Sequence, residues 1–424
     1  MFATIKKAVL QGEYTAPPSK SDTHRALICG ALANGFSYIS PINSSSKDIE
    51  ATLNALQLFE SKIQLNEDVA LVQGISGTPQ GNIRIFCGES ASTLRFLLPV
   101  AAAFGIEAVF TGTGGLSKRP LALYHELLEC KGVTLDRLES DELPLKICGK
   151  LHAGKFYIRG DISSQFISGL LFALPLLTDD SEIILTSKLE SKPYVDMTLE
   201  TLRLFGIKAF ETNNGYKIAG GQHYTPCTYH VEGDYSNAAY FAVAGLLSNG
   251  LSICGLSPSS KQGDSSIFKI LKLFGANIAI NDDKITVSKS KLCGTSIDAA
   301  QIPDLVPILA VLGTFAEGET LIYGAHRLRL KESDRLKSIT EALSAVGADI
   351  HCDNDSIKIR GGKPLRGGVV SSYNDHRIVM SMAVAALYCD EEIIIDGAES
   401  VKKSYPNFFS DYNKLGGCAD VRLG

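Results

Sequence analysis

The residues of this chain best suited to chemistry are lysines and arginines near hydroxyl groups at the predicted starts of apolar helices. The first group is SKSDTHR at 19–25, which follows Pro17-Pro18 and precedes an apolar run that ends near Asn34-Gly35. Proline does not continue a helix and Asn-Gly commonly ends one, so a helix is predicted to start in this group. Free N–H groups at a helix start, a lysine and an arginine together suit a phosphate or a carboxylate. A capped surface helix is the alternative interpretation of one such stretch.

The same arrangement recurs further along the chain. The recurring stretches are CGESASTLR at 87–95, TGTGGLSKRP at 111–120, GDISSQF at 160–166 and SKPYVD at 191–196. The glycine-rich stretch matches neither the P-loop nor the dinucleotide-binding fingerprint, so nucleotide binding is not indicated. Each stretch alone is more often a helix cap or a loop, but their recurrence favours a ligand with phosphate groups or hydroxyls.

The second half of the chain carries further charged motifs. These are LKESDRL at 330–336, NDHR at 374–377 and KKSY at 402–405. If 331–335 is helical, Lys331 and Arg335 share one face and repel each other unless an anion lies between them. Glu332 and Arg335 are spaced to form an ion pair. Asp304 stands in an apolar run, where a buried acid needs a partner or a function.

The composition excludes several classes of protein. The chain has 424 residues, a net charge of −5 and no tryptophan, which disfavours a nucleic-acid partner. No apolar stretch is long enough for a membrane span, and the first residues lack the apolar core of a signal peptide, so we expect a cytoplasmic protein. The ten cysteines form no C-x-x-C pair and have no histidine nearby at zinc spacing, so we expect them to be reduced and structural.

A local pattern repeats about every 70 residues: a leucine-rich helix end, a glycine, and a short β-branched run. The marker positions are Glu60, Gly132, Gly206, Gly275, Gly347 and Gly416. Each glycine is predicted to take the left-handed conformation that ends a helix before a strand, with Glu60 as a degenerate copy. Six near-equal steps predict an α/β fold built from six similar modules.

Six modules suggest two lobes of three. We predict one lobe at residues 19–232 and a second at 1–18 plus 233–424, with a hinge near 17–20 and 231–234. The first helix motif then lies on the hinge.

Taken in order, these motifs resemble the 3-phosphoshikimate 1-carboxyvinyltransferase family over essentially the whole chain. The resemblance implies a two-lobed inside-out α/β barrel of six βαβαββ repeats, three per lobe, with the active site in the cleft between them. It implies a cytoplasmic, monomeric transferase of the shikimate pathway. Such an enzyme joins the 5-hydroxyl of shikimate 3-phosphate to C2 of phosphoenolpyruvate and then expels phosphate, without metal or cofactor.

The resemblance also assigns residues to the site. The implied catalytic residues are Lys20, Asp304, Glu332 and Lys403, with Asp304 as the base for the hydroxyl and Glu332 as the proton carrier at C3. Those implied to bind shikimate 3-phosphate are Lys20, Ser21, Arg25, Ser163, Ser164, Gln165, Ser191, Asp304 and Lys331. Those implied to bind phosphoenolpyruvate are Lys20, Ala91, Arg119, Gln165, Arg335, Arg377 and Lys403.

Three positions depart from the family pattern. Pro18 replaces a glycine, which stiffens the predicted hinge. Glu89 and Ala91 replace the usual Asn and Gly of the loop at 88–92. Ala91 adds a methyl group where phosphoenolpyruvate fits closely, so we expect reduced sensitivity to the longer inhibitor glyphosate.

Two alternatives remain open at this stage. One is the sibling enzyme that transfers enolpyruvyl to UDP-N-acetylglucosamine, although its loop cysteine is absent from 114–119 and Ser21 stands where it has asparagine. The other is a non-catalytic phospholigand-binding protein that kept the cleft. RNA-processing proteins of similar repeats are disfavoured by the charge and the few aromatic residues.

Overall fold

A computed structural model gives the fold, and it describes residues 1–79, 81–281 and 284–422. The chain divides into two compact units: Met1–Pro17 with Glu232–Gly424, here the split unit, and Pro18–Val231, here the continuous unit. Each unit has its own cluster of buried apolar side chains. The predicted hinge at the two passages between the units stays a prediction.

The continuous unit contains three four-stranded sheets in the part of it that is described. The first has the order β14 (Thr228–His230), β3 (Phe36–Ser40), β5 (Val69–Gln73) and β4 (Lys62–Asn66). The second has the order β6 (Ile83–Phe86), β7 (Ala108–Thr111), β9 (Leu145–Gly149) and β8 (Val133–Arg137). The third has the order β10 (Lys155–Ile158), β11 (Ser181–Leu185), β13 (Gly215–Ile218) and β12 (Ala209–Thr212).

The split unit repeats this arrangement, again with three sheets among its described residues. The first has the order β2 (Glu13–Thr15), β15 (Leu251–Cys254), β17 (Lys284–Ser288) and β16 (Asn277–Asn281). The second has the order β18 (Ser296–Asp298), β19 (Gly318–Tyr323), β21 (Ile357–Gly361) and β20 (Asp349–Cys352). The third has the order β22 (Gly368–Ser371), β23 (Ile393–Asp396), β1 (Phe2–Lys6) and β24 (Cys418–Arg422).

Every one of these described sheets has the same pairing: its first two strands are parallel, and the other neighbours are antiparallel. A parallel pair needs a crossover, which a helix supplies, whereas an antiparallel pair can be a hairpin. This is the pairing of a βαβαββ module, so the predicted α/β fold of six repeats is confirmed.

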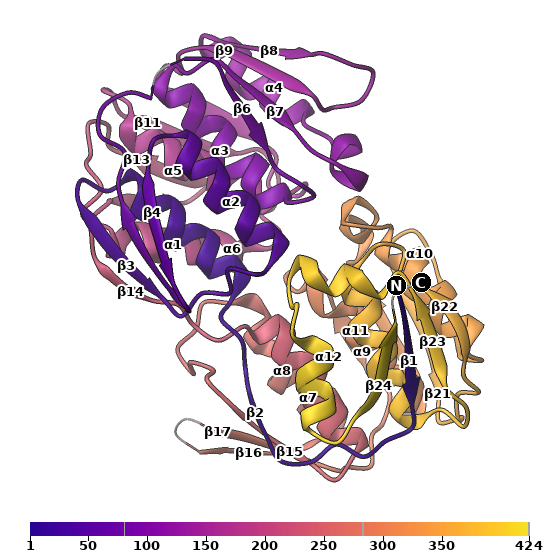
Figure 1. Cartoon of the computed structure of the whole chain (residues 1–424). Helices are drawn as coiled ribbons and strands as arrows, with labels where there is room; N and C mark the ends of the chain where they lie inside the picture. Colours follow the sequence, from indigo (N-terminus) through magenta and orange to yellow (C-terminus); the bar gives the residue numbers. More distant parts are fainter. Residues whose placement is uncertain (80, 282–283, 423–424) are drawn as a thin grey trace. The chain divides into compact units, whose positions relative to one another are not determined.

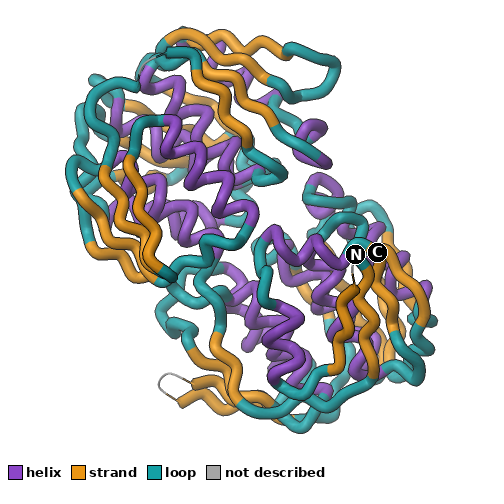
Figure 2. The backbone as a smooth tube through the Cα atoms, viewed as in Figure 1, coloured by secondary structure: helices purple, strands orange, loops and turns teal. Residues whose placement is uncertain are grey.

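Helices fill the inside of each unit and strands form its outer layer (Figure 2). One helix of each described module is buried along nearly its whole length: α1 (Lys20–Leu32), α3 (Ala91–Phe104), α5 (Ser164–Ala173), α7 (Tyr235–Leu247), α9 (Val306–Phe315) and α11 (His376–Ala385). The second helix has an exposed side: α2 (Lys47–Leu58), α4 (Ala122–Leu128), α6 (Lys192–Leu204), α8 (Ile267–Leu273), α10 (Arg335–Ala345) and α12 (Phe408–Lys414). Figure 1 labels these elements.

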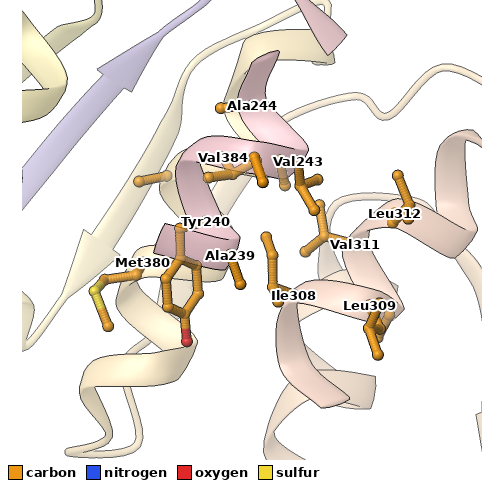
Figure 3. Packing of buried hydrophobic residues seen from close by; sticks show 14 of the residues in the cluster. Ala239, Tyr240, Val243, Ala244, Ile308, Leu309, Val311, Leu312, Met380 and Val384 are labelled. Carbon is orange, nitrogen blue, oxygen red and sulfur yellow. The ribbon is translucent and has the colours of Figure 1, made fainter. Parts of the chain in front are cut away.

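The inner helices of the split unit are α7, α9 and α11, and each contacts the other two. Small residues such as Ala239 and Ala244 on α7 let Val243, Ile308 and Val311 pack closely (Figure 3). Close packing of this kind fixes the axes of the three helices. It therefore also fixes the position of the polar residues at their N-terminal ends.

The outer helices end as the repeat pattern predicts. The backbone angle φ is positive at all six marker positions: Glu60 (66°), Gly132 (90°), Gly206 (80°), Gly275 (90°), Gly347 (94°) and Gly416 (98°). Each marker lies one to three residues before the next strand. The predicted left-handed helix termini are confirmed, including the degenerate copy at Glu60.

Candidate active site

A carboxylate–guanidinium cluster at the start of α10 dominates the split unit. Arg335 is 1% exposed and donates from Nε to Asp375 Oδ2 (2.8 Å), from Nη1 to Asp304 Oδ1 (2.6 Å) and from Nη2 to Glu332. Burial alone would lower the pKa of Arg335, but the carboxylates of Asp375, Glu332 and Asp304 outweigh it and raise that pKa. Arg335 is therefore a permanent cation that holds three acids in place, and its predicted pairing with Glu332 is confirmed.

Asp304 lies in the short 3₁₀ helix η5 (Pro303–Leu305), which runs directly into α9. Its carboxylate contacts three cations: Arg335, Arg377 Nη2 at 3.1 Å and Lys331 Nζ at 3.4 Å. Burial raises the pKa of Asp304, yet Arg377, Lys331 and Arg335 together hold it well below 3.8. Asp304 is thus ionised at neutral pH, which is the state that a proton acceptor needs, and the surrounding cations make it a weak base.

The prediction that Lys331 and Arg335 share a helical face is wrong. Lys331 ends the 3₁₀ helix η6 (His326–Leu330) in an extended conformation, and α10 begins only at Arg335, capped by Asp334. The two cations still converge, because both reach Asp304 Oδ1. The anion that the sequence required between them is thus supplied by a side chain of the protein itself.

Strained backbone precedes α11. Tyr373 and Asn374 both have positive φ, 51° and 54°, which is unfavourable for residues other than glycine. The strain places Asp375 as the N-cap of α11, where it accepts from the Arg377 backbone N–H at 2.9 Å. Lys403, at the end of the 3₁₀ helix η8 (Ala398–Lys403), donates to the Asn374 carbonyl at 2.6 Å. This turn therefore gathers Arg377 and Lys403 beside the Arg335 cluster.

Asp264 is a buried carboxyl group that the sequence did not single out. It lies in the 3₁₀ helix η4 (Gly263–Ser266), is fully buried, and accepts a hydrogen bond from Ser236 on α7. Burial is the main cause that raises its pKa to about 7, and Asp304 and Asp234 add to the shift, while Arg377 and Ser236 oppose it. Because its pKa is raised, the folded protein binds this proton more tightly than the unfolded chain does.

Asp264 is expected to make stability fall as the pH rises from about 4 to about 7, with no further fall above that, and Asp264→Asn should remove this fall. Ionising Asp264 above its folded pKa of about 7 places a buried charge near Asp304, whereas the neutral amide cannot ionise. Urea unfolding of wild type and variant at pH 5 and pH 8 measures the effect. The free energy of unfolding of the variant minus that of wild type should be larger at pH 8 than at pH 5. An equal difference at the two pH values would exclude this role of Asp264.

Lys20 opens α1 in the continuous unit, as predicted for the first helix motif. Ser19 is the N-cap and accepts from the Asp22 backbone N–H at 3.4 Å. Lys20 Nζ forms an ion pair with Asp48 Oδ2 on α2 at 2.5 Å. Sequence reasoning missed Asp48, since nothing in KDIEATLNAL distinguishes it from an ordinary acid in the first turn of a helix.

Arg25 is buried one turn further along α1. It donates to the Ser21 carbonyl at 2.6 Å, to the Tyr194 carbonyl at 2.8 Å and to Thr198 Oγ1 at 2.9 Å. These bonds use three of its five N–H donors and tie α1 to α6. Ser191, the residue before α6, has a positive φ of 53° and is buried.

Gln165 connects the starts of α3 and α5. Its Oε1 accepts from Arg95 Nη1 at 3.0 Å, and its Nε2 donates to Ser92 Oγ at 3.0 Å. Ser163 caps α5, and Ser164 is its first residue. Gln165 therefore contacts Ser92, the residue that follows Ala91 at the start of α3.

The glycine-rich loop lies against the loop that carries Glu89. A Cβ built on Gly114 would come within 2.6 Å of Glu89 Oε2, so the carboxylate fits there only because residue 114 is glycine. Arg119 follows the 3₁₀ helix η1 (Gly114–Lys118) and is buried. The next residue, Pro120, accepts from Arg95 Nη2 at 3.3 Å, which links Arg119 to the α3 and α5 starts.

The model of the family described as EPSP synthase (3-phosphoshikimate 1-carboxyvinyltransferase) matches residues 5–412. The chain belongs to the EPSP synthase family. The resemblance seen in the sequence is confirmed. A 3-phosphoshikimate 1-carboxyvinyltransferase of Clostridium novyi is 45% identical over 97% of this chain and 96% of that protein. One of Clostridioides difficile is 44% identical over 98% of each chain.

Solved structures agree with this family assignment. An EPSP synthase from Acinetobacter baumannii has a TM-score of 0.83 and 26% identity, with all of both chains covered. The enolpyruvyl transferase NikO of Streptomyces tendae, with a TM-score of 0.79 and 17% identity, shares the fold over 99% of this chain and 98% of its own. Among the described residues, every helix is too short or too polar to cross a membrane.

Proposed function

We propose that this member of the EPSP synthase family transfers the enolpyruvyl group of phosphoenolpyruvate to the 5-hydroxyl of shikimate 3-phosphate and releases phosphate. The observation that carries the proposal is the placement of two acids, Asp304 and Glu332, on the one guanidinium of Arg335. Addition and elimination need one group that accepts a proton and one that donates a proton, held in fixed relation. The names of the 44–45% identical relatives supply the substrates.

In the proposed reaction Glu332 donates a proton to C3 of phosphoenolpyruvate, which makes C2 electrophilic. Asp304 accepts the proton of the attacking 5-hydroxyl, and a C–O bond forms at C2 to give a tetrahedral intermediate. Glu332 then takes a proton back from C3 as phosphate leaves C2 with the proton that Asp304 had accepted, which restores the double bond and both carboxyl groups. Lys20 and Lys403 balance the charge on the phosphate that leaves.

Binding of phosphoenolpyruvate would also make Asp304 a better base. We assign the anionic groups of phosphoenolpyruvate to Arg335 and Arg377 in the split unit and to Arg119, Gln165 and Ala91 in the continuous unit. Arg335 and Arg377 both contact the Asp304 carboxylate. When a substrate anion pairs with the same two arginines, they lower the pKa of Asp304 less. The pKa of Asp304 therefore rises on substrate binding, when a base is needed.

Shikimate 3-phosphate is assigned to hydroxyls and cations at the starts of helices. Two seryl groups at the start of α5 and the buried Ser191 can donate to phosphate oxygens, and Arg25 retains two N–H donors for the same ligand. The full proposed set is Lys20, Ser21, Arg25, Ser163, Ser164, Gln165, Ser191, Asp304 and Lys331.

The test is phosphate release from phosphoenolpyruvate with each acceptor in turn. Release that depends on shikimate 3-phosphate is the expected result. Release with UDP-N-acetylglucosamine alone would transfer the activity to the sibling enzyme. Release with neither, while both ligands bind, would favour a non-catalytic binding protein.

Ala91→Gly is expected to make the enzyme more sensitive to glyphosate than the wild type is. Ala91 is buried at the first position of α3, and its methyl group narrows the proposed phosphoenolpyruvate site. A longer ligand loses more from this methyl than the substrate does, because an overfilled site cannot yield without strain. Inhibition titrations of both proteins measure the ratio, and equal sensitivity would contradict the idea.

A further inference from the structure

Helix α2 carries none of the residues assigned to a substrate, yet it is joined to α1 by two side-chain contacts one helical turn apart. Asp48 binds Lys20 at 2.5 Å, and Thr52 Oγ1 contacts His24 Nδ1 at 2.8 Å. Residues four apart lie on the same face of a helix, so the two contacts join the same faces of α1 and α2, one turn apart.

The contact between His24 and Thr52 continues into α3. Thr52 Oγ1 lies 2.6 Å from Thr93 Oγ1, and Thr93 Oγ1 donates to Ser90 Oγ at 2.8 Å. Ser90 is the N-cap of α3 and also accepts from the Thr93 backbone N–H at 3.2 Å. None of the four side chains is more than 1% exposed. The buried relay His24, Thr52, Thr93, Ser90 therefore connects the start of α1 to the start of α3.

The relay has one direction. Each hydroxyl has a single proton, and Thr93 gives its proton to Ser90. Thr52 must then donate to Thr93 and accept from His24, which assigns the proton of the neutral imidazole to Nδ1. Burial is the main cause that lowers the pKa of His24 well below 6.5, and Lys20 and Arg25 add to it, so the imidazole stays neutral. The relay is thus unchanged across the physiological pH range.

Both ends of the relay adjoin residues assigned above to phosphoenolpyruvate. Lys20 is one turn before His24, and Ala91 directly follows Ser90. Thr52 is the residue of the relay that contacts both neighbouring helices. A change at Thr52 would move the two parts of the proposed site relative to each other inside the continuous unit.

We propose that Thr52 is a positioning residue for phosphoenolpyruvate: through its hydroxyl, α2 holds the α1 start with Lys20 and the α3 start with Ala91 in one arrangement. The inference rests on the proposed function. Without the hydroxyl, the His24 N–H loses its acceptor and Thr93 loses a donor, both in a buried region. The helix starts then adjust, and small displacements of binding groups weaken a preorganised site.

The experiment compares Thr52→Val, which removes the hydroxyl at nearly constant volume, with Thr52→Ser, which keeps it. Thr314→Val is the matched control: Thr314 is a buried threonine of α9 that donates to the Val311 carbonyl. Thr52→Val should raise KM for phosphoenolpyruvate about tenfold, as expected for loss of one buried hydrogen bond, with KM for shikimate 3-phosphate within about twofold. Thr52→Ser and Thr314→Val should leave both constants close to wild type.

A second readout does not need activity. Nitrogen-15 spectra of histidine-labelled protein should show His24 as the Nδ1–H form in wild type and a changed signal in Thr52→Val. An Nε2–H form in wild type would overturn the relay. Equal rises in both KM values, or a lower Tm with unchanged KM, would show that Thr52 is only structural. A wild type that releases no phosphate would instead overturn the proposed function, and this assignment with it.

Discussion

Replacing Asp304 by alanine is expected to lower turnover at least about 100-fold, the usual contribution of a general base. Asp304 lies directly before α9 with Arg335, Arg377 and Lys331 around its carboxylate. Removing it deletes the proposed acceptor of the hydroxyl proton and leaves three cations with less counter-charge. Steady-state phosphate release at saturating substrates measures the loss in kcat.

The fold should survive this substitution, because Arg335 keeps Asp375 and Glu332 as partners. Circular dichroism and the Tm establish that the variant is folded before rates are compared. Asp349→Ala, at a half-exposed acid of β20, is the control and should keep wild-type turnover. A folded Asp304→Ala protein with near wild-type kcat would remove Asp304 from the role of base.

Replacing Arg335 by methionine is expected to lower the free energy of unfolding by about 3–5 kcal/mol, as found when one partner of a buried ion pair is removed. This one guanidinium contacts three carboxylates, and the Asp375 carboxylate is fully buried with it. Methionine fills similar space but carries no charge. The loss is large against the roughly 5–15 kcal/mol that stabilises a typical domain.

Hydrogen exchange can localise this effect. Amide protons of α9 and α11 should exchange faster in Arg335→Met, whereas those of α3 and α5 in the continuous unit should keep wild-type protection. Arg203→Met is the matched control, because Arg203 forms an exposed ion pair with Glu200 and should not change either region. Unchanged exchange throughout Arg335→Met would mean that other contacts hold the three acids.

Features that depend on neighbouring residues in the chain could be predicted from the sequence. The left-handed helix ends are an example: Gly206 and Gly275 take the conformation that glycine favours. The pairing of Glu332 with Arg335 followed from a spacing of three residues and was found even though the segment is not helical.

Features that depend on tertiary partners could not be predicted. Lys331 to Asp334 has helix-forming residues, but Asp334 caps α10 instead and the preceding residues stay outside the helix. Asp48 became notable only when α2 was packed against α1, which brought it to Lys20. Asp264 likewise needed the packing of η4 under Ser236 to reveal a buried acid.

The order of the strands has a consequence for synthesis on the ribosome. Strand β1 pairs only with β23 and β24 among the described strands, with Ile5 opposite Ile393 and Ala419 (Figure 1). At translation rates of about 5–20 residues per second, roughly 20–80 s pass between the synthesis of β1 and that of β23, its first partner. Every described strand of the continuous unit lies within Pro18–Val231, so that unit can fold while the opening strand is still waiting. While residues 232–392 are made, the nascent chain can therefore hold one folded unit together with the unpaired strand β1, which is a segment for chaperones to shield.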